Sequence, residues 1–222
     1  NVFNVFNVLN VSPIYDLTFE NIKKMKKYDL IATIQCAGNR RNEYNSIHNT
    51  SGTKWNIGAI STAKWTGVML RDILPKNIDD SIKFVNIKSI DDMEISIPIE
   101  KVLDTNGDVM LAYEMNDIEI PKEHGYPIRL IVPGYIGIRN IKYVKSIHLS
   151  KTESTSNWQQ KLTYKSLPPF IKNKKDIENY NIDVEKYPPI NKFPIQSAIC
   201  DVKEQNNKLL IKGYAFASGK GI

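Results

Sequence analysis

A cysteine, a tight turn and two arginines follow one another in the stretch Gln35-Cys36-Ala37-Gly38-Asn39-Arg40-Arg41. The apolar, β-branched run before it predicts a buried strand over 31–36 that delivers Cys36 to the turn. Because Gly38 and Asn39 tolerate left-handed backbone angles, we expect the turn to aim Cys36 and the arginines at one point. Adjacent guanidinium charge favours a thiolate, which is a nucleophile or a soft metal ligand. The alternative interpretation is a small buried residue at a strand end, since unpaired cysteines are often buried.

A second polar zone lies near the middle of the chain, over residues 121–142. His124 leads into Arg129, an apolar strand predicted over 130–132 and a glycine-containing loop that ends at Lys142. Glycines followed by Arg and Lys form a backbone cradle with cationic ends, which suits a terminal phosphate. On its own this loop is a weak signal, because a lone histidine is more often a hydrogen-bonded structural residue than a ligand.

The elements around these two zones are short and mostly extended. The first eleven residues repeat Asn-Val-Phe and Asn-Val-Leu, which fits an edge strand or a low-complexity insertion. Thr18 is the expected N-cap of a helix that leads into the cysteine strand. We further predict a helix over 67–74, strands within 82–99 about a turn at 91–92, a helix over 100–103, a strand over 109–113 and a strand over 209–217.

The composition is that of a globular protein with an ample core: 222 residues, 41% of them hydrophobic. The net charge of +6 suits an anionic substrate or cofactor, whereas the scattered lysines give no indication of a nucleic-acid partner. No apolar run approaches the roughly 18 residues of a membrane span, and we expect no targeting leader within these residues. Cys36 and Cys200 lie too far apart in sequence to suggest a disulfide framework, and the three histidines lack zinc-site spacing.

Several longer motifs occur in a fixed order along the chain. They are QCAGNRR from Gln35, Trp55, Gly58 to Trp65, Ala112 to Asn116, His124 to Arg129, Pro133-Gly134 and Trp158-Gln159-Gln160. In this order and spacing the chain resembles the sulfite oxidase family, in the molybdenum-cofactor domain shared with plant-type nitrate reductases. The resemblance runs from about Leu17 to about Gly221. It implies an α+β, mostly β molybdopterin-binding domain followed by the start of an immunoglobulin-like β-sandwich.

The resemblance also implies roles for individual residues. Cys36 is the expected protein ligand of molybdenum. The residues expected to bind the molybdopterin and its phosphate, besides Cys36, are His124, Arg129, Asn140, Ile141 and Lys142. At the substrate, Arg41 is expected to clamp the oxyanion and Trp55 to form the pocket wall, with Tyr164 presenting its hydroxyl. One extra residue separates Tyr164 from Trp158 relative to the family pattern.

The implied activity is the oxidation of sulfite to sulfate, with electrons passed to a haem, a cytochrome such as cytochrome c, or oxygen. Haem b is expected only if a separate domain carries it. The family implies a homodimer formed through the C-terminal domain and a place in the mitochondrial intermembrane space, with peroxisome and cytosol left open. We expect residues 1–165 to form the cofactor domain and 166–222 a linker and the beginning of the dimerisation domain.

Some expected family features have no counterpart in this sequence. The family's upstream arginine and Asn-His pair have no counterpart in residues 1–16, so we expect the cofactor domain to be N-terminally incomplete. An acidic cofactor contact expected near Lys88 is also absent. A nitrate-reductase-type domain is one alternative function. It is disfavoured by the Ala63-Lys64 and Glu114-Met115 pairs, which look like sulfite oxidase. A non-catalytic family member that acts as an interaction module is the other alternative, and the retention of Cys36, Arg41 and Trp55 argues against it.

Overall fold

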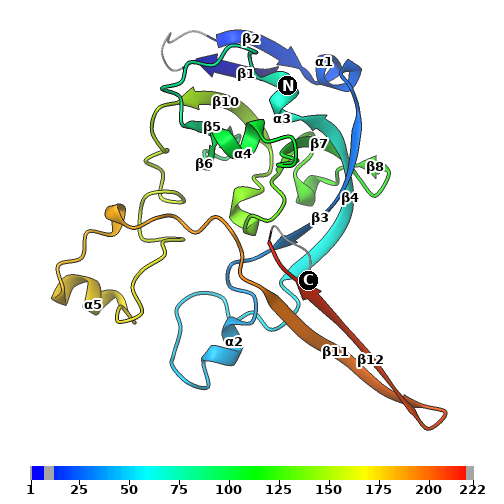
Figure 1. Ribbon diagram of the computed structural model, residues 1–222, viewed down its shortest axis with the longest axis vertical. Coiled ribbons are helices and arrows are strands. Elements are labelled where there is room, and N and C mark those ends of the chain that lie inside the picture. The colour runs from blue at the N-terminus through cyan, green and yellow to red at the C-terminus, as the bar shows by residue number, and fades with distance from the viewer. Residues whose placement is uncertain (1, 8–12, 219–222) are drawn as a thin grey trace.

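The computed structural model describes residues 2–7 and 13–218. It contains two five-stranded sheets and a separate two-stranded hairpin (Figure 1). The strands are β1 (Val2–Asn7), β2 (Pro13–Thr18), β3 (Tyr28–Gln35), β4 (Ile60–Met69), β5 (Phe84–Ser89), β6 (Glu94–Pro98), β7 (Met110–Met115), β8 (Ile118–Glu119), β9 (Arg129–Ile131), β10 (Val144–Ser150), β11 (Gln196–Gln205) and β12 (Lys208–Phe216). The helices are short: α1 (Phe19–Lys24), α2 (Arg41–Tyr44), α3 (Leu70–Ile73), α4 (Ile99–Leu103), α5 (Lys174–Asn179) and the 3₁₀ turns η1 (Lys122–His124), η2 (Gly137–Arg139) and η3 (Val184–Lys186).

The first sheet has the strand order β2-β1-β10-β5-β6. β1 pairs with β2 on one side and runs parallel to β10 on the other, and the remaining pairs are antiparallel. β1 is therefore an internal strand, so the prediction of an edge strand at the start of the chain was wrong, and β2 forms the edge instead. Residues 8–11 of that predicted segment lie outside the described residues.

The second sheet has the order β3-β4-β7-β8, with β9 also paired to β7, and all of its pairs are antiparallel. The predicted helix over 67–74 was wrong in its first half. β4 continues to Met69, and α3 occupies only Leu70–Ile73. Strand pairing decides this, because residues 67–69 pair with β7, and Gly67 crosses that strand so closely that a Cβ would lie 2.1 Å from the Leu111 carbonyl oxygen.

The main core lies where the two sheets face each other. Val85, Ile87, Ile95 and Ile97 of the first sheet are fully buried in one cluster that also takes in apolar side chains of β4, β7 and β9. Burying each such side chain contributes about 1.5–3 kcal/mol, so this cluster holds the sheets in fixed relation. α1 closes one end of the core through the buried Ile22, and its predicted N-cap is confirmed, because Thr18 and Asn21 form a reciprocal capping box.

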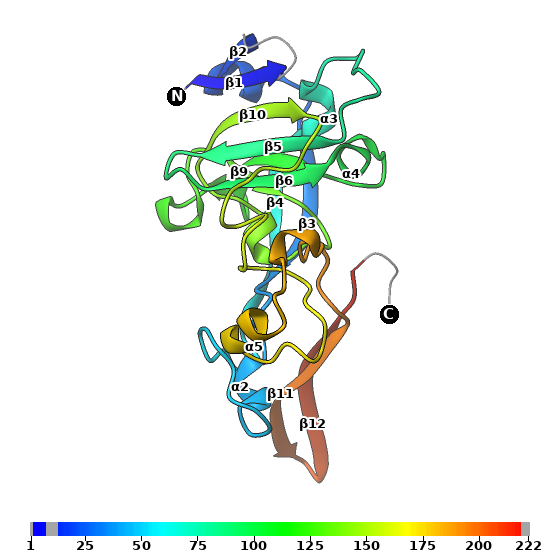
Figure 2. The same ribbon diagram turned by 90° about the vertical axis from the view of Figure 1, so that its left-hand side faces the viewer.

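The hairpin of β11 and β12 projects away from both sheets (Figure 1). Figure 2 shows β3 and β4 running from the sheets toward α2 and the base of this hairpin. The predicted strand near the C-terminus is confirmed as β12, while the β-sandwich and the domain boundary at 165 stay predictions. Several apolar side chains of the hairpin are exposed: Ile199, Val202, Leu209, Leu210 and Ile211.

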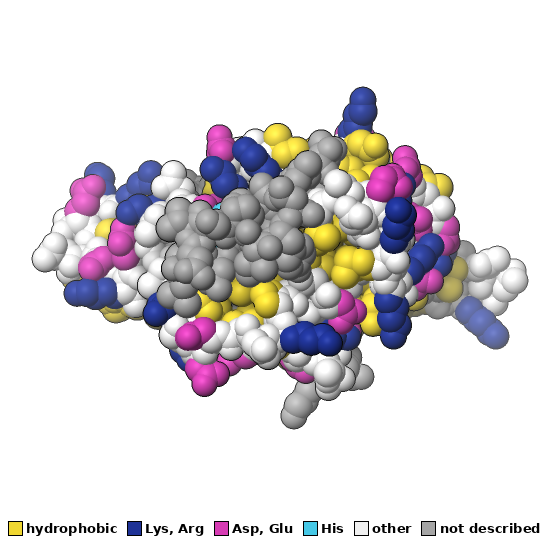
Figure 3. Space-filling model, turned by 90° about the horizontal axis from the view of Figure 1, so that it is seen from above, with side chains coloured by type: hydrophobic (Ala, Val, Ile, Leu, Met, Phe, Trp, Pro, Cys, Tyr) yellow, Lys and Arg dark blue, Asp and Glu magenta, His cyan; other side chains and the backbone are white. Residues whose placement is uncertain are grey.

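The surface around β1, β2 and α1 carries charges of both signs. Lys and Arg side chains alternate with Asp and Glu on this face (Figure 3), and many of the ion pairs lie at the surface, such as Lys88–Asp92 at 2.9 Å. Mixed surface charge of this kind is typical of solvated faces. Within residues 2–7 and 13–218, no helix has the length and apolar character that spanning a membrane requires.

Candidate active site

The cysteine turn lies at the end of β3, where it was predicted. The prediction that this strand is buried was wrong, because β3 is an edge strand of its sheet and Ile31 is exposed. Cys36 is half-buried, its backbone N–H donates to the Ala59 carbonyl at 2.9 Å, and the Gly38 N–H donates to Cys36 Sγ at 3.4 Å. The left-handed residue of the turn is Arg40, with φ of 65°, so the prediction that Gly38 or Asn39 takes this role was wrong. The Arg40 backbone N–H donates to the Asn56 carbonyl at 2.9 Å, and its guanidinium is bound to the carboxylate of Glu43 at 2.7 Å and to the carbonyl of Ser197.

The two arginines of the turn therefore diverge. Arg40 points toward Glu43 and the hairpin, whereas the guanidinium of Arg41 passes between two glycines and donates to the Thr53 carbonyl at 3.1 Å. A Cβ on Gly38 or Gly52 would lie 2.6 or 2.5 Å from this guanidinium. The glycines thus provide the space that Arg41 occupies, and the expectation that both arginines meet the cysteine is wrong for Arg40.

A cavity of about 590 Å³ opens beside Cys36. Its wall brings together residues from five separate parts of the chain. The predicted site residues that line it are Cys36, Trp55, His124, Arg129, Lys142 and Tyr164. Arg41, the predicted substrate clamp, is not part of this lining, although its charge acts on the Tyr164 phenol at the cysteine end. The lining includes His, Arg and Lys but neither Asp nor Glu. Such a wall is electropositive and complements an anion.

Trp55 and Tyr164 lie at the cysteine end of this cavity. Trp55 is 43% exposed, so it stands at the rim rather than lying buried as a core lid. Tyr164 is held with a left-handed φ of 61°, and its carbonyl accepts from the Ile190 N–H at 2.7 Å. Burial, together with the charge of Cys36, raises the pKa of the Tyr164 phenol, although Arg41 and Arg139 oppose this. A bulky residue in this backbone region is strained, which is common where a side chain must be aimed.

Arg129, Lys142 and His124 form the basic end of the cavity. Arg129 is 7% exposed and donates to the carbonyls of Asn140 and His124 at 3.3 and 3.1 Å. In the described part of the chain it has no ion-pair partner, and burial lowers its pKa to about 10. Burial and the nearby Arg129 also lower the pKa of Lys142. Among the described residues neither Arg129 nor Lys142 forms an ion pair, although the charge of Glu123 opposes the lowering of the Lys142 pKa. Two such cations in one cavity are a set of donors prepared for an anionic group.

Asn140 and Ile141 do not line this cavity. The Asn140 amide is buried and bonds only to backbone atoms, among them the Val132 N–H at 2.7 Å. Both residues line a smaller adjoining cavity of about 170 Å³, which shares Arg129 and Lys142 with the larger one. The side chains of Asn140 and Ile141 thus fix the loop that carries Lys142.

Sequence reasoning missed one residue that shapes the site and misplaced another. Trp65, 3% exposed, lines the cavity and lies under the Arg129 guanidinium, 5.4 Å from its ring centre. Arg139 is fully buried and donates to the Gln159 side chain at 2.7 Å and the Trp158 carbonyl at 2.9 Å, fastening η2 to the segment that leads to Tyr164. Trp65 falls in a motif already noted. Arg139 is the arginine that the sequence placed at a cationic end of the phosphate cradle, and this expectation was wrong, because its guanidinium is buried against Gln159 and Trp158 and does not line the cavity.

Comparison with known proteins identifies the family. Residues 5–158 match the model described as oxidoreductase molybdopterin binding domain. The chain belongs to this family. The architecture agrees with it, since the sulfane dehydrogenase SoxCD from Paracoccus pantotrophus shares the fold, with a TM-score of 0.70 over 89% of this chain and 46% of that one, at 24% identity.

Relatives within the molybdopterin-binding family include sulfite oxidases. The mitochondrial enzyme of Mus musculus is 35% identical over 91% of this chain, and the sulfite oxidase of Arabidopsis thaliana is 35% identical over 91%. A nitrate reductase (NADH) from Ulva prolifera is 29% identical over 92% of the chain. The chain spans 38% of the mouse protein, 55% of the Arabidopsis protein and 26% of the Ulva protein.

The cavity fits the group after which the family is named. A molybdopterin carries a phosphate, which suits the cationic Arg129 and Lys142, and sulfur-bound molybdenum, which suits a cysteine thiolate. Among the described residues, no cluster of three or more His, Cys, Asp or Glu is arranged to hold a metal ion. In this arrangement Cys36 would hold the metal and the basic end would hold the phosphate.

Proposed function

We propose that the chain is the molybdenum-binding catalytic part of a sulfite oxidase. The observation that carries this proposal is a single cavity with the Cys36 thiol, the Trp55 indole and the Tyr164 phenol at one end and cations at the other. The sulfite oxidases among the relatives support the choice of substrate.

In this proposal the reaction adds one oxygen atom to sulfite and removes two electrons. The bound cofactor would supply the oxygen atom and accept the electrons. Arg41 would draw the oxyanion toward the cysteine end with charge-assisted hydrogen bonds, since its guanidinium is fixed between Gly38 and Gly52. Trp55 would restrict the opening to a small anion.

Tyr164 would donate a hydrogen bond from its hydroxyl to the same oxyanion. Its raised pKa keeps the phenol protonated in the neutral range, so the proton needed for that bond is present. Cys36 would act through its Sγ as the protein ligand of the metal, with the Gly38 N–H steadying the sulfur.

Electron acceptor, assembly and compartment belong to the same proposal. We expect the electrons to pass to a cytochrome such as cytochrome c, a homodimer to form through the C-terminal part, and the protein to act in the mitochondrion, because several sulfite oxidases among the relatives are mitochondrial.

The test is steady-state kinetics of the molybdenum-loaded protein with sulfite and ferricyanide, beside a nitrate reduction assay. Arg41→Gln should raise the sulfite KM by about tenfold or more, the effect of losing one charge-assisted contact, while bound molybdenum stays near the parent level. Arg40→Gln is the matched control, since the Arg40 guanidinium is bound to the Glu43 carboxylate and the Ser197 carbonyl and faces the hairpin. Nitrate turnover without sulfite turnover would move the proposal to a nitrate reductase.

A further inference from the structure

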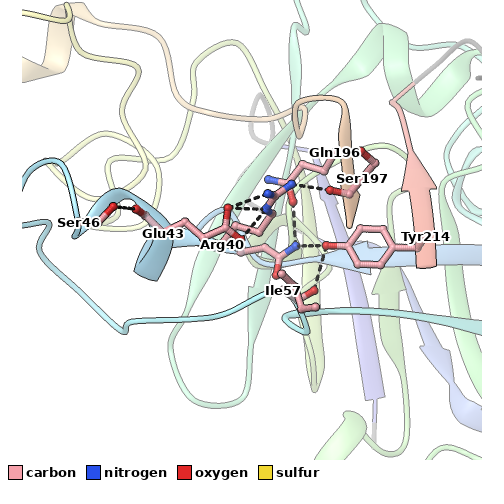
Figure 4. A network of polar contacts seen from close by, with 8 residues as sticks. Arg40, Glu43, Ser46, Ile57, Gln196, Ser197 and Tyr214 are labelled. Atoms are coloured by element: carbon pink, nitrogen blue, oxygen red, sulfur yellow. Dashed lines mark hydrogen bonds and ion pairs between the residues drawn. The ribbon is translucent and has the colours of Figure 1, made fainter. Parts of the chain in front are cut away.

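The hairpin of β11 and β12 reaches the cysteine turn although none of its residues lines the cavity. Asn39 of the turn bonds to Gln196 and Tyr214 of the hairpin. Figure 4 shows these two hairpin residues together with the neighbouring contact between Arg40 and Ser197. Asn39 is 4% exposed, so water does not substitute for these partners.

Every polar hydrogen of the Asn39 amide is used. Its Nδ2 donates to Gln196 Oε1 at 2.8 Å and to the Tyr214 hydroxyl oxygen at 2.9 Å, and its Oδ1 accepts from the Ala59 N–H at 2.9 Å. The Tyr214 hydroxyl in turn donates to the Ile57 carbonyl at 2.9 Å. The direction of each bond is therefore fixed. In Asn39→Asp a carboxylate oxygen would replace the donating Nδ2 and would face the Gln196 Oε1, so that two hydrogen-bond acceptors would repel each other.

The same contacts lead to the cysteine. Both backbone polar groups of Ala59 are hydrogen-bonded. Its N–H donates to the Asn39 side chain, and its carbonyl accepts from the Cys36 N–H at 2.9 Å. Ala59 also lines the cavity. A shift of the hairpin would thus displace the Cys36 backbone, because a chain of hydrogen bonds runs from Tyr214 through Asn39 and Ala59 to Cys36.

We propose that Tyr214 and Asn39 are positioning residues through which the C-terminal hairpin sets the place of Cys36. The inference rests on the proposed function only in giving Cys36 a catalytic role, since the geometry itself involves no cofactor. Neither Tyr214 nor Asn39 lines the cavity. They act by holding the Ala59 peptide and the turn.

The experiment uses the reactivity of the Cys36 thiol as the measure of its position. The cofactor-free chain carries Cys200→Ser, because Cys200 is an exposed thiol that would also react. Alkylation of Cys36 by iodoacetamide is followed at one pH in three forms: parent, Tyr214→Phe and Asn39→Asp. Tyr44→Phe is the matched control, since Tyr44 is exposed on the neighbouring α2 and lies outside the cavity lining.

We expect the Cys36 alkylation rate to change by roughly fivefold in Tyr214→Phe, as for the loss of one hydrogen bond, and by more in Asn39→Asp. Amide exchange at Ala59 should quicken in both, whereas exchange in β5 and β6 should stay as in the parent. The control should match the parent in all three readings.

Unchanged Cys36 reactivity and Ala59 exchange in Tyr214→Phe would overturn the proposal. So would a uniform rise in exchange over the whole chain, which would mark these residues as general stabilisers. The alkylation rate and the amide exchange are both measured without molybdenum, so their outcome does not depend on the proposed sulfite chemistry.

Discussion

Arg129 offers the sharpest test of the basic end of the cavity. Replacement by Met keeps much of the side-chain volume and removes the charge. Burial lowers the pKa of Arg129 to about 10, well below the ordinary value of a guanidinium. At about 1.36 kcal/mol for each unit of pKa, the buried charge costs on the order of 3 kcal/mol. A phosphate in the cavity would recover a share of this cost.

We therefore expect Arg129→Met to weaken binding of the molybdenum cofactor by about 10-fold to 100-fold. The stability of the ligand-free chain should change much less, by about 1 kcal/mol, because the lost contacts to Asn140, His124 and Trp65 are offset by removal of a buried charge. The assay is cofactor transfer from a carrier protein, with bound molybdenum titrated against carrier concentration, beside urea unfolding of the free chain.

Arg71→Met is the matched control, since Arg71 lies on α3 outside the cavity and bonds only weakly, at 3.4 Å, to the Asp104 carbonyl. It should bind cofactor like the parent. If Arg129→Met binds the molybdenum cofactor as tightly as the parent, the inference that the Arg129 guanidinium binds an anionic group of the cofactor is refuted.

Three further predictions concern Gly52, Tyr164 and Lys142. In Gly52→Ala the new Cβ would lie 2.5 Å from Arg41 Nη1, at a backbone φ of 95°, and should displace the guanidinium. The sulfite KM should therefore rise with molybdenum content unchanged, and an unaltered KM would contradict the placement of Arg41. Tyr164→Phe should lower kcat/KM for sulfite by about tenfold, and the parent pH–rate profile should show no tyrosine limb below pH 10, since burial raises this pKa from 10.0. Burial and Arg129 lower the pKa of Lys142 from 10.5, so the unfolded chain binds more protons at this group just below pH 10.5, and the contribution of Lys142 to the stability of the free chain should rise with pH there. Urea titrations should show a smaller rise in Lys142→Met, and equal slopes would contradict the shift.

Local patterns predicted much of the fold. The strand before Cys36, the Thr18 cap and the two strands around residues 91–92 all follow from alternation and turn chemistry, which act over a few residues. The apolar end of β4 was misread as helix because a short buried run has no decisive period, and pairing with both β3 and β7 decides it.

The assembly of the site depended on the family resemblance. Residues as distant as Trp55, Arg129 and Tyr164 share one cavity, which no pattern within a single segment indicates. Asn39 shows the limit most clearly, since its partner Tyr214 lies 175 positions away and neither residue type is distinctive on its own. The left-handed angle at Arg40 was also missed, and the Ser197 carbonyl that its guanidinium contacts is likewise distant in sequence.

The central claim is that Cys36 binds molybdenum in this cavity, and the sulfur count at the metal tests it most directly. The measurement is molybdenum K-edge X-ray absorption of the loaded protein in the Cys200→Ser background, with and without Cys36→Ser. The account predicts that Cys36→Ser removes one sulfur from the metal shell and, with it, sulfite oxidation. An unchanged number of sulfur ligands in Cys36→Ser would contradict it.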